Sequence, residues 1–143
     1  MKPLQDTPFE AHFLDGSRGR LFALYFPAMG EARGKVLCIP PFTEESNRCR
    51  VMLGMGARAL AHSGWGVLII DLFGTGDSEG EFSDSRWCIW RDDLRAVFDW
   101  ARSGDARHFQ LLAVRLGATF CADLMEIPDV AIDRIMTWAP VRK

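Results

Sequence analysis

The hydrophobic pattern of this chain predicts six strands, two of them adjacent at the start and the others separated by helices. The predicted strands are residues 10–14, 20–27, 35–42, 66–74, 108–115 and 133–141. The first two flank the turn "DGSRG", which predicts an antiparallel hairpin with Gly16 and Gly19 at positive φ. The runs at 35–42 and 66–74 are nearly continuous, as in parallel strands that are covered on both faces.

Two segments between these strands have helical spacing. Residues 47–64 predict a helix that Gly64 closes. Its expected core face carries Met52, Met55, Ala59 and Leu60. The second stripe consists of Trp87, Trp90, Leu94, Val97, Phe98 and Ala101. Strands that alternate with helices imply right-handed crossovers and a mostly parallel sheet with helices on both faces. Ligands of such α/β sheets bind beyond the carboxyl ends of the strands.

Composition and charge narrow the classes of partner. The chain has 143 residues, of which 48% are hydrophobic and 25% charged, as expected for one globular domain over 1–143. Its net charge of −2 comes from interspersed charges, which excludes a basic surface for nucleic acid or an anionic membrane. The start has no signal or transit peptide pattern. Four cysteines without C-x-x-C spacing predict reduced thiols in a cytoplasmic protein, and no motif indicates a cofactor or a metal.

The stretch "LLAVRLGATF" at 111–120 predicts a strand that turns sharply into a helix. Ala113 and Gly117 stand two positions on either side of Arg115. A serine-hydrolase elbow has G-x-S-x-G here, because the two backbones pack closely around a strained turn that exposes the central side chain. The small flanking residues are therefore present, and arginine stands where the serine would be.

Several motifs together resemble the α/β-hydrolase fold: the hairpin, "PPFTEE" after the third strand, D-x-x-G-x-G-x-S from Asp71 to Ser78, and "AVRLGA" at the elbow. More narrowly, "PPFTEESNRCR", "IDLFGTGDSEGEF" and the arginine-bearing elbow resemble the exosortase A system-associated hydrolases of the second type. The resemblance implies an ester or acyl hydrolase near bacterial exopolysaccharide production and protein sorting.

Three departures from the family pattern accompany this resemblance. The usual histidine-glycine pair after the third strand is Pro40-Pro41, and the elbow serine is Arg115. The sequence given stops at Lys143, whereas the family pattern has two further strands that deliver the acid and the histidine of the triad. We therefore expect a truncated form of the fold that lacks its C-terminal strands, with the strand near 135–139 at an exposed edge that favours self-association.

Other nucleophiles and bases are weak candidates. His12, His62 and His108 are expected on the surface or at the boundary of the core, away from the carboxyl edge of the sheet. The Ser78 hydroxyl is expected to cap backbone groups of its Gly-rich turn. Cys121 is expected to be a packed thiol. The Gly-rich stretch also lacks the residues of a phosphate-binding loop.

The predicted site lies around the elbow. The resemblance implies oxyanion donors at the backbone N–H groups of Phe42 and Leu116, and Leu116 is expected to open a helix whose N-terminus favours negative charge. We expect Arg115 to form a buried bidentate pair with Glu44 or Glu45 at the pocket floor. The residues predicted to line this pocket are Glu44, Glu45, Asp71 and Gly117.

Two functions remain open from the sequence. One is hydrolysis of an ester or acyl group on a small molecule, including a saccharide-linked one. The other is a non-catalytic α/β-hydrolase-fold protein that binds an anionic ligand or a protein partner.

Overall fold

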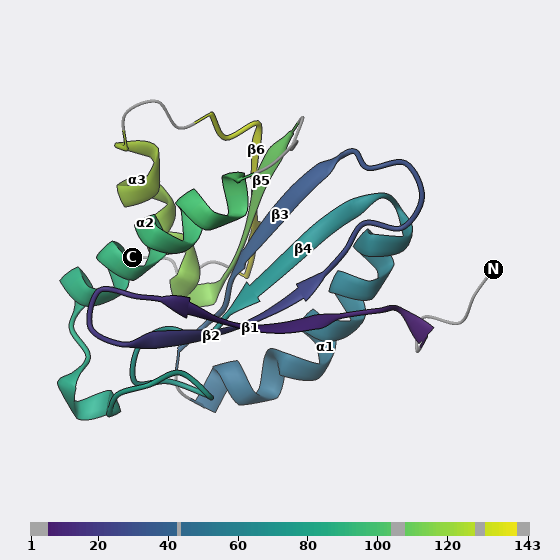
Figure 1. Ribbon diagram of the computed structural model, residues 1–143. Helices are drawn as coiled ribbons and strands as arrows, with labels where there is room; N and C mark the ends of the chain where they lie inside the picture. Colours follow the sequence, from purple (N-terminus) through teal and green to yellow (C-terminus); the bar gives the residue numbers. More distant parts are fainter. Residues whose placement is uncertain (1–5, 43, 104–107, 128–130, 140–143) are drawn as a thin grey trace.

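The structure is a computed structural model that describes residues 6–42, 44–103, 108–127 and 131–139. Its centre is a six-stranded sheet in the order β1-β2-β4-β3-β5-β6 (Figure 1). The strands are β1 (Glu10–Asp15), β2 (Arg20–Phe26), β3 (Gly34–Ile39), β4 (Trp65–Ile70), β5 (Phe109–Val114) and β6 (Arg134–Trp138). The last four run parallel to one another, while β2 is antiparallel to both of its neighbours, β1 and β4. All six predicted strands are therefore present.

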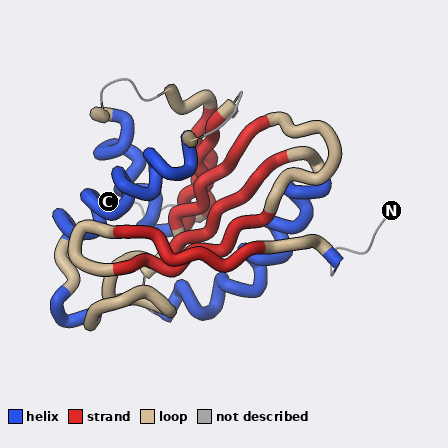
Figure 2. Tube along the Cα trace, in the orientation of Figure 1, coloured by secondary structure: helices blue, strands red, loops and turns tan. Residues whose placement is uncertain are grey.

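Helices cover both faces of this sheet (Figure 2). The elements are α1 (Glu44–His62), α2 (Trp87–Arg102) and α3 (Phe120–Met125), with short 3-10 segments η2 (Phe82–Asp84) and η3 (Arg115–Thr119). Successive residues of β3 point to opposite faces, as a pleated strand requires. Leu37 and Ile39 join the core under α2 and α3, whereas Val36 and Cys38 face α1. The molecule therefore has three layers.

The core face of α1 differs from the one expected. Leu53, Ala57 and Ala61 are buried against the sheet, whereas Met52 and Met55 are 50% and 57% exposed. Both sets fit helical spacing, and the small side chains of Ala57 and Ala61 let the second half of the helix lie close to the strands. The predicted end of the helix is correct, because Gly64 has φ +91° and its N–H bonds the carbonyl of Ala61.

The hairpin turn uses its glycines for space rather than for positive φ. Neither Gly16 nor Gly19 adopts the left-handed conformation that the sequence suggested. A Cβ on Gly16 would lie 2.6 Å from the Gly19 carbonyl oxygen and 2.9 Å from a carboxylate oxygen of Asp93. The turn is therefore tight because it packs against α2.

The two edges of the described sheet are β1 and β6. Among the described residues β6 pairs only with β5, as expected for an edge strand. Self-association through this edge stays a prediction, which size-exclusion chromatography tests. None of the helices within the described ranges is long and apolar enough to cross a membrane.

Candidate functional site

The turn after β5 has the geometry expected of an elbow. Arg115 adopts φ +54°, a strained conformation for a residue with a Cβ. A Cβ on Gly117 would lie 2.6 Å from the carbonyl oxygen of Ile39 and 2.9 Å from that of Pro40. Ala113 is fully buried on the other side of the turn. The small flanking residues therefore allow the close approach of β5 and η3 to the end of β3.

Arg115 is paired with Glu45 from the first turn of α1. Its Nη2 donates to Glu45 Oε1 at 3.0 Å and its Nε donates to Oε2 at 3.4 Å, so the contact is bidentate. The expected pairing is present, but its expected burial is wrong, because both side chains are 43% exposed. The hydrogen bond and charge of Glu45 raise the pKa of Arg115, which therefore stays a cation.

The helix after the elbow is shorter than the sequence suggested. Leu116 lies in the 3-10 segment η3, and the α-helix starts only at Phe120 and has six residues. The helix N-terminus expected at Leu116 is therefore that of a 3-10 segment, and its preference for an anion stays a prediction. Phe42 and Leu116 follow the neighbouring strands β3 and β5. The role of their N–H groups as oxyanion donors stays a prediction.

An aromatic cluster packs beside the elbow. The Phe42 ring centroid lies 4.5 Å from that of Trp90 and 5.6 Å from that of Phe120. Trp87 stacks on Phe120 at 3.9 Å. These contacts fix the segment after β3 against α2 and α3. The helical stripe contains both tryptophans, of which Trp90 is buried and Trp87 is 43% exposed, but nothing in the local sequence linked them to Phe42.

The loop after β4 contains a second arginine–carboxylate site. Arg50 Nη2 donates to both oxygens of Asp71, at 3.0 and 2.9 Å. The backbone N–H of Asp77 donates to Asp71 Oδ2 at 3.0 Å. Gly76 has φ +52°, and a Cβ there would overlap the Asp71 carboxylate. Asp71 therefore organises the loop. Sequence reasoning missed Arg50, although it lies in the helix that connects the adjacent strands β3 and β4.

The two alternative nucleophiles, Ser78 and Cys121, have structural roles: one is hydrogen-bonded to backbone groups and the other is buried. Ser78 Oγ accepts from the N–H of Phe22 at 2.8 Å and donates to the carbonyl of Asp71 at 2.6 Å, which agrees with the expected capping role. Cys121 is buried in the core, as expected, and this burial raises the pKa of its thiol.

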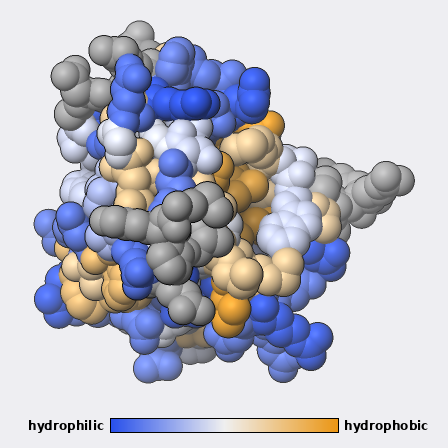
Figure 3. All heavy atoms as spheres, turned by 90° about the vertical axis from the view of Figure 1, so that its right-hand side faces the viewer, coloured by the Kyte–Doolittle hydropathy of each residue, from blue (hydrophilic) through white to orange (hydrophobic). Residues whose placement is uncertain are grey.

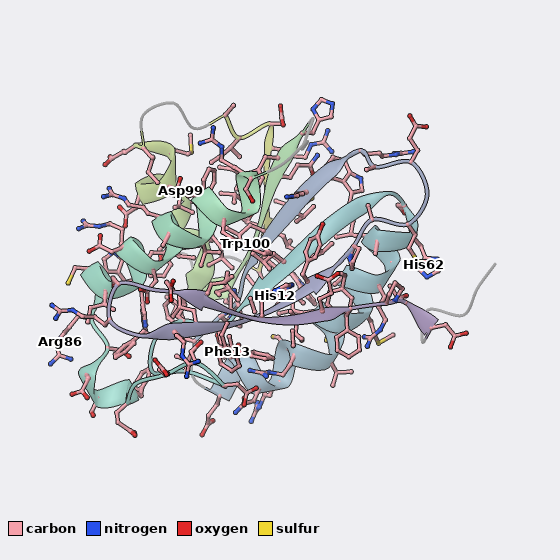
Figure 4. The ribbon with its side chains drawn as sticks, in the orientation of Figure 1. His12, Phe13, His62, Arg86, Asp99 and Trp100 are labelled. Carbon is pink, nitrogen blue, oxygen red and sulfur yellow. The ribbon has the colours of Figure 1, made fainter. Side chains whose placement is uncertain are left out.

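The histidines contact other parts of the molecule. His12 bonds Glu10 on β1 at 2.9 Å and lies beside Trp100 (Figure 4). His62, at the far end of α1 in Figure 4, lies 3.0 Å from the Thr7 hydroxyl. His108 precedes β5, at the amino edge of the sheet. Within the described part of the chain, none of these histidines is bonded to a serine or a cysteine.

Two hollows lie at opposite edges of the sheet. A cavity of about 590 Å³ at the amino edge is bordered by His62 and His108. Figure 3 views the molecule from this side and shows apolar side chains between polar ones. A cleft of about 330 Å³ lies at the carboxyl edge, where sheets of this type bind ligands. Its lining residues are Glu44, Ser46, Asn47, Gly74, Thr75, Gly76 and Phe82.

The four predicted pocket residues do not form one cluster. Glu44 lines the carboxyl-edge cleft and Glu45 pairs with Arg115. Asp71 borders a separate small cavity of about 40 Å³, and Gly117 is buried under the end of β3. The described ranges contain no group of three or more metal-ligating side chains.

Comparison with known proteins shows which solved structures have a similar fold. No family model matches the sequence, and no curated protein matches it significantly. An α/β serine hydrolase without a lid from Xanthomonas campestris superposes with a TM-score of 0.75 and 26% identity, covering 97% of this chain and 64% of that one. The chain has the α/β-hydrolase fold.

Further α/β-hydrolase neighbours agree. Est1E of Butyrivibrio proteoclasticus, solved with ferulic acid, has a TM-score of 0.76 and 24% identity, covering 91% of this chain and 53% of that one. An α/β serine hydrolase homologue from Coxiella burnetii has a TM-score of 0.71 and 22% identity, covering 92% and 62%. The chain spans between about half and two thirds of the length of these structures.

Proposed function

We propose that this protein is a ligand-binding relative of the serine hydrolases. It binds a neutral ester or acyl-bearing small molecule in the carboxyl-edge cleft and does not cleave it through the elbow. The observation that supports this function is the bidentate Arg115–Glu45 pair at the elbow. A guanidinium has no lone pair with which to attack a carbonyl, and a serine hydrolase needs a hydroxyl next to a histidine.

The charges around the site favour a neutral ligand over an anionic one. Six charged side chains line the cleft or form the two ion-pair sites beside it: Glu44, Glu45, Asp71, Asp77, Arg50 and Arg115. The four carboxylates and two guanidinium groups of this set leave a formal charge of about −2. Arg115 is already neutralised by Glu45, and Glu44 adds a negative charge to the cleft itself. An anion would therefore be repelled.

Hydrolysis of an ester or acyl group is the second candidate. It is favoured by the 26% identity to a serine hydrolase over nearly the whole of this chain.

Both candidates share the setting implied by the sequence resemblance, beside bacterial exopolysaccharide and exosortase systems. A cytoplasmic location is part of the proposal, because all four cysteines are free.

Incubation of the chain with p-nitrophenyl butyrate separates the two candidates. We expect saturation-transfer NMR to detect binding, while nitrophenolate release stays at the level of heat-inactivated protein. Asn47→Trp should block the cleft and abolish binding. Ala59→Trp, at another exposed position of α1, should not. Turnover above the heat-inactivated control would overturn the proposal in favour of hydrolysis, and absence of both binding and turnover would contradict both candidates.

A further inference from the structure

We propose that the carboxyl-edge cleft is a saccharide site, in which a neutral sugar or polyol stacks on Phe82 and its hydroxyl groups bond Glu44, Ser46 and Asn47. This inference rests on the proposed function, because it names the part of the ligand that occupies the same cleft. The cleft volume of about 330 Å³ is in the usual range for a small-molecule site.

One wall of the cleft carries polar groups with unused hydrogen-bonding capacity. Glu44, Ser46 and Asn47 lie in the first turn of α1. Within the described part of the chain, none of these three side chains has a hydrogen bond or an ion pair. They supply a carboxylate, a hydroxyl and a carboxamide, so both donors and acceptors face the cleft.

The opposite wall carries an aromatic ring that is exposed and fixed. Phe82 is 52% exposed. Its ring centroid lies 6.2 Å from that of Trp90, whose indole N–H donates to the carbonyl of Phe73 at 2.8 Å. One side of the Phe82 ring is therefore supported by the core, while the other side is free to contact a ligand.

The loop between these walls is held in place before any ligand binds. The N–H of Gly74 bonds the carbonyl of Glu79 at 2.9 Å, and the Thr75 hydroxyl donates to the carbonyl of Leu72 at 2.7 Å. Asp71 holds the N–H of Asp77 in the same loop. A preformed loop lowers the entropy that binding costs.

The combination of these walls matches the chemistry of a sugar better than that of other ligands. A pyranose has a face of C–H groups that contacts an aromatic ring, and a rim of hydroxyls that bonds carboxylate and amide groups. A hydrocarbon without the carbonyl of an ester or the hydroxyls of a sugar would desolvate Glu44, Ser46 and Asn47 without giving them partners. An anion would meet the unpaired Glu44 carboxylate.

Binding of simple methyl hexosides tests the inference. We expect saturation-transfer NMR to detect at least one of methyl α-D-glucopyranoside, methyl α-D-galactopyranoside and methyl α-D-mannopyranoside, but neither cyclohexanol nor glucuronate. Phe82→Ala should weaken binding by about fivefold or more, as expected for an aromatic anchor. Phe13→Ala is the matched control, because Phe13 is 55% exposed and lies on β1 (Figure 4), and it should leave binding unchanged.

Further variants keep the test decisive. Asn47→Ala should weaken hexoside binding while the circular dichroism spectrum stays that of wild type. If Phe82→Ala fails to fold, Phe82→Leu removes the ring and retains an apolar side chain, and the same loss is expected. Hexoside binding that is equal in wild type and both Phe82 variants would overturn the inference. So would binding of p-nitrophenyl butyrate without any hexoside, which leaves the proposed function standing. Absence of both kinds of binding overturns both proposals.

Discussion

Two arginine–carboxylate contacts at the same edge of the sheet differ in what they do for the molecule. The Asp71 side chain in the β4 loop is only 9% exposed and bonds Arg50 and the N–H of Asp77. At the elbow, the Arg115 and Glu45 side chains are each 43% exposed and bond each other. The residue types are the same, and the surroundings are not.

This difference indicates which contact stabilises the fold. A buried carboxylate that holds a loop leaves several donors unsatisfied when it is removed. An exposed ion pair is screened by water and contributes little. The Asp71 site therefore stabilises the loop that borders the cleft, whereas the Arg115–Glu45 pair contributes little to stability and can change without unfolding the protein.

The largest effect should come from Asp71→Ala. The variant removes the acceptor of the Asp77 N–H and of Arg50, and we expect it to lose about 2–3 kcal/mol of unfolding free energy. Urea denaturation measures this loss. Asp77→Ala is the control, because the Asp77 side chain is largely exposed, and its effect should be within about 0.5 kcal/mol. Equal losses for the two variants would remove the contrast between the two contacts.

Ser78→Ala should have the next largest effect. It leaves the N–H of Phe22 and the carbonyl of Asp71 without their side-chain partner, at a cost of about 1–2 kcal/mol. The same hydroxyl should not react with a fluorophosphonate probe, because both of its contacts are to backbone. Mass spectrometry of the treated protein checks this, and a phosphonylated Ser78 would show that the loop is catalytic.

The buried carboxylate of Asp93 offers a third case for the comparison, since no cation among the described residues forms an ion pair with it. Burial raises the pKa of Asp93, partly offset by hydrogen bonds from Ser17. Because the folded pKa lies above the unfolded one, this group destabilises the fold as pH rises through the folded pKa. Asp93→Asn should therefore gain stability relative to wild type at pH 7 and lose that advantage towards pH 4.

Thermal melts of wild type and Asp93→Asn between pH 4 and pH 7 measure this effect. Asp99→Asn, at an exposed position of the same helix (Figure 4), is the control for removing one negative charge from α2. A constant difference for Asp93→Asn would show that its charge is not destabilising.

The smallest effect should come from Arg115→Ala. Because the pair with Glu45 is exposed, we expect the melting temperature to change by less than about 3 °C, similar to Arg95→Ala at another exposed site. Arg115→Gly should melt at or above the wild-type temperature, because glycine adopts φ +54° without strain. A loss for Arg115→Ala as large as that of Asp71→Ala would refute the distinction between the two contacts.

Much of the fold could be predicted from local patterns. All six strands, the end of α1 at Gly64 and the small flanking residues of the elbow follow from periodicity and glycine placement. The core face of α1 could not be predicted, because Met52 and Leu53 lie on stripes that both fit helical spacing. Local sequence predicts positive φ for the glycines of the hairpin turn. It cannot predict that the Asp93 carboxylate, from a distant part of the chain, leaves no room for a Cβ at Gly16.

The site could be predicted only in part. The elbow motif placed Arg115 and limited its partner to Glu44 or Glu45, but the choice between them depends on how the first turn of α1 faces β5. The pairing of Arg50 with Asp71 and the aromatic contacts of Phe42 were missed, because they join side chains from different elements.

The sequence by itself determined the order of strands and helices and the sharp turn at Arg115, because hydrophobic period and small residues act over a few neighbouring positions. Only the tertiary structure decided that Glu45, 70 positions from Arg115, is its partner and that Glu44 lines the cleft with Phe82. It also decided that the pair is exposed while Asp71 is buried. Burial and pairing are set by how separate elements pack together, and the same local sequence can serve either outcome.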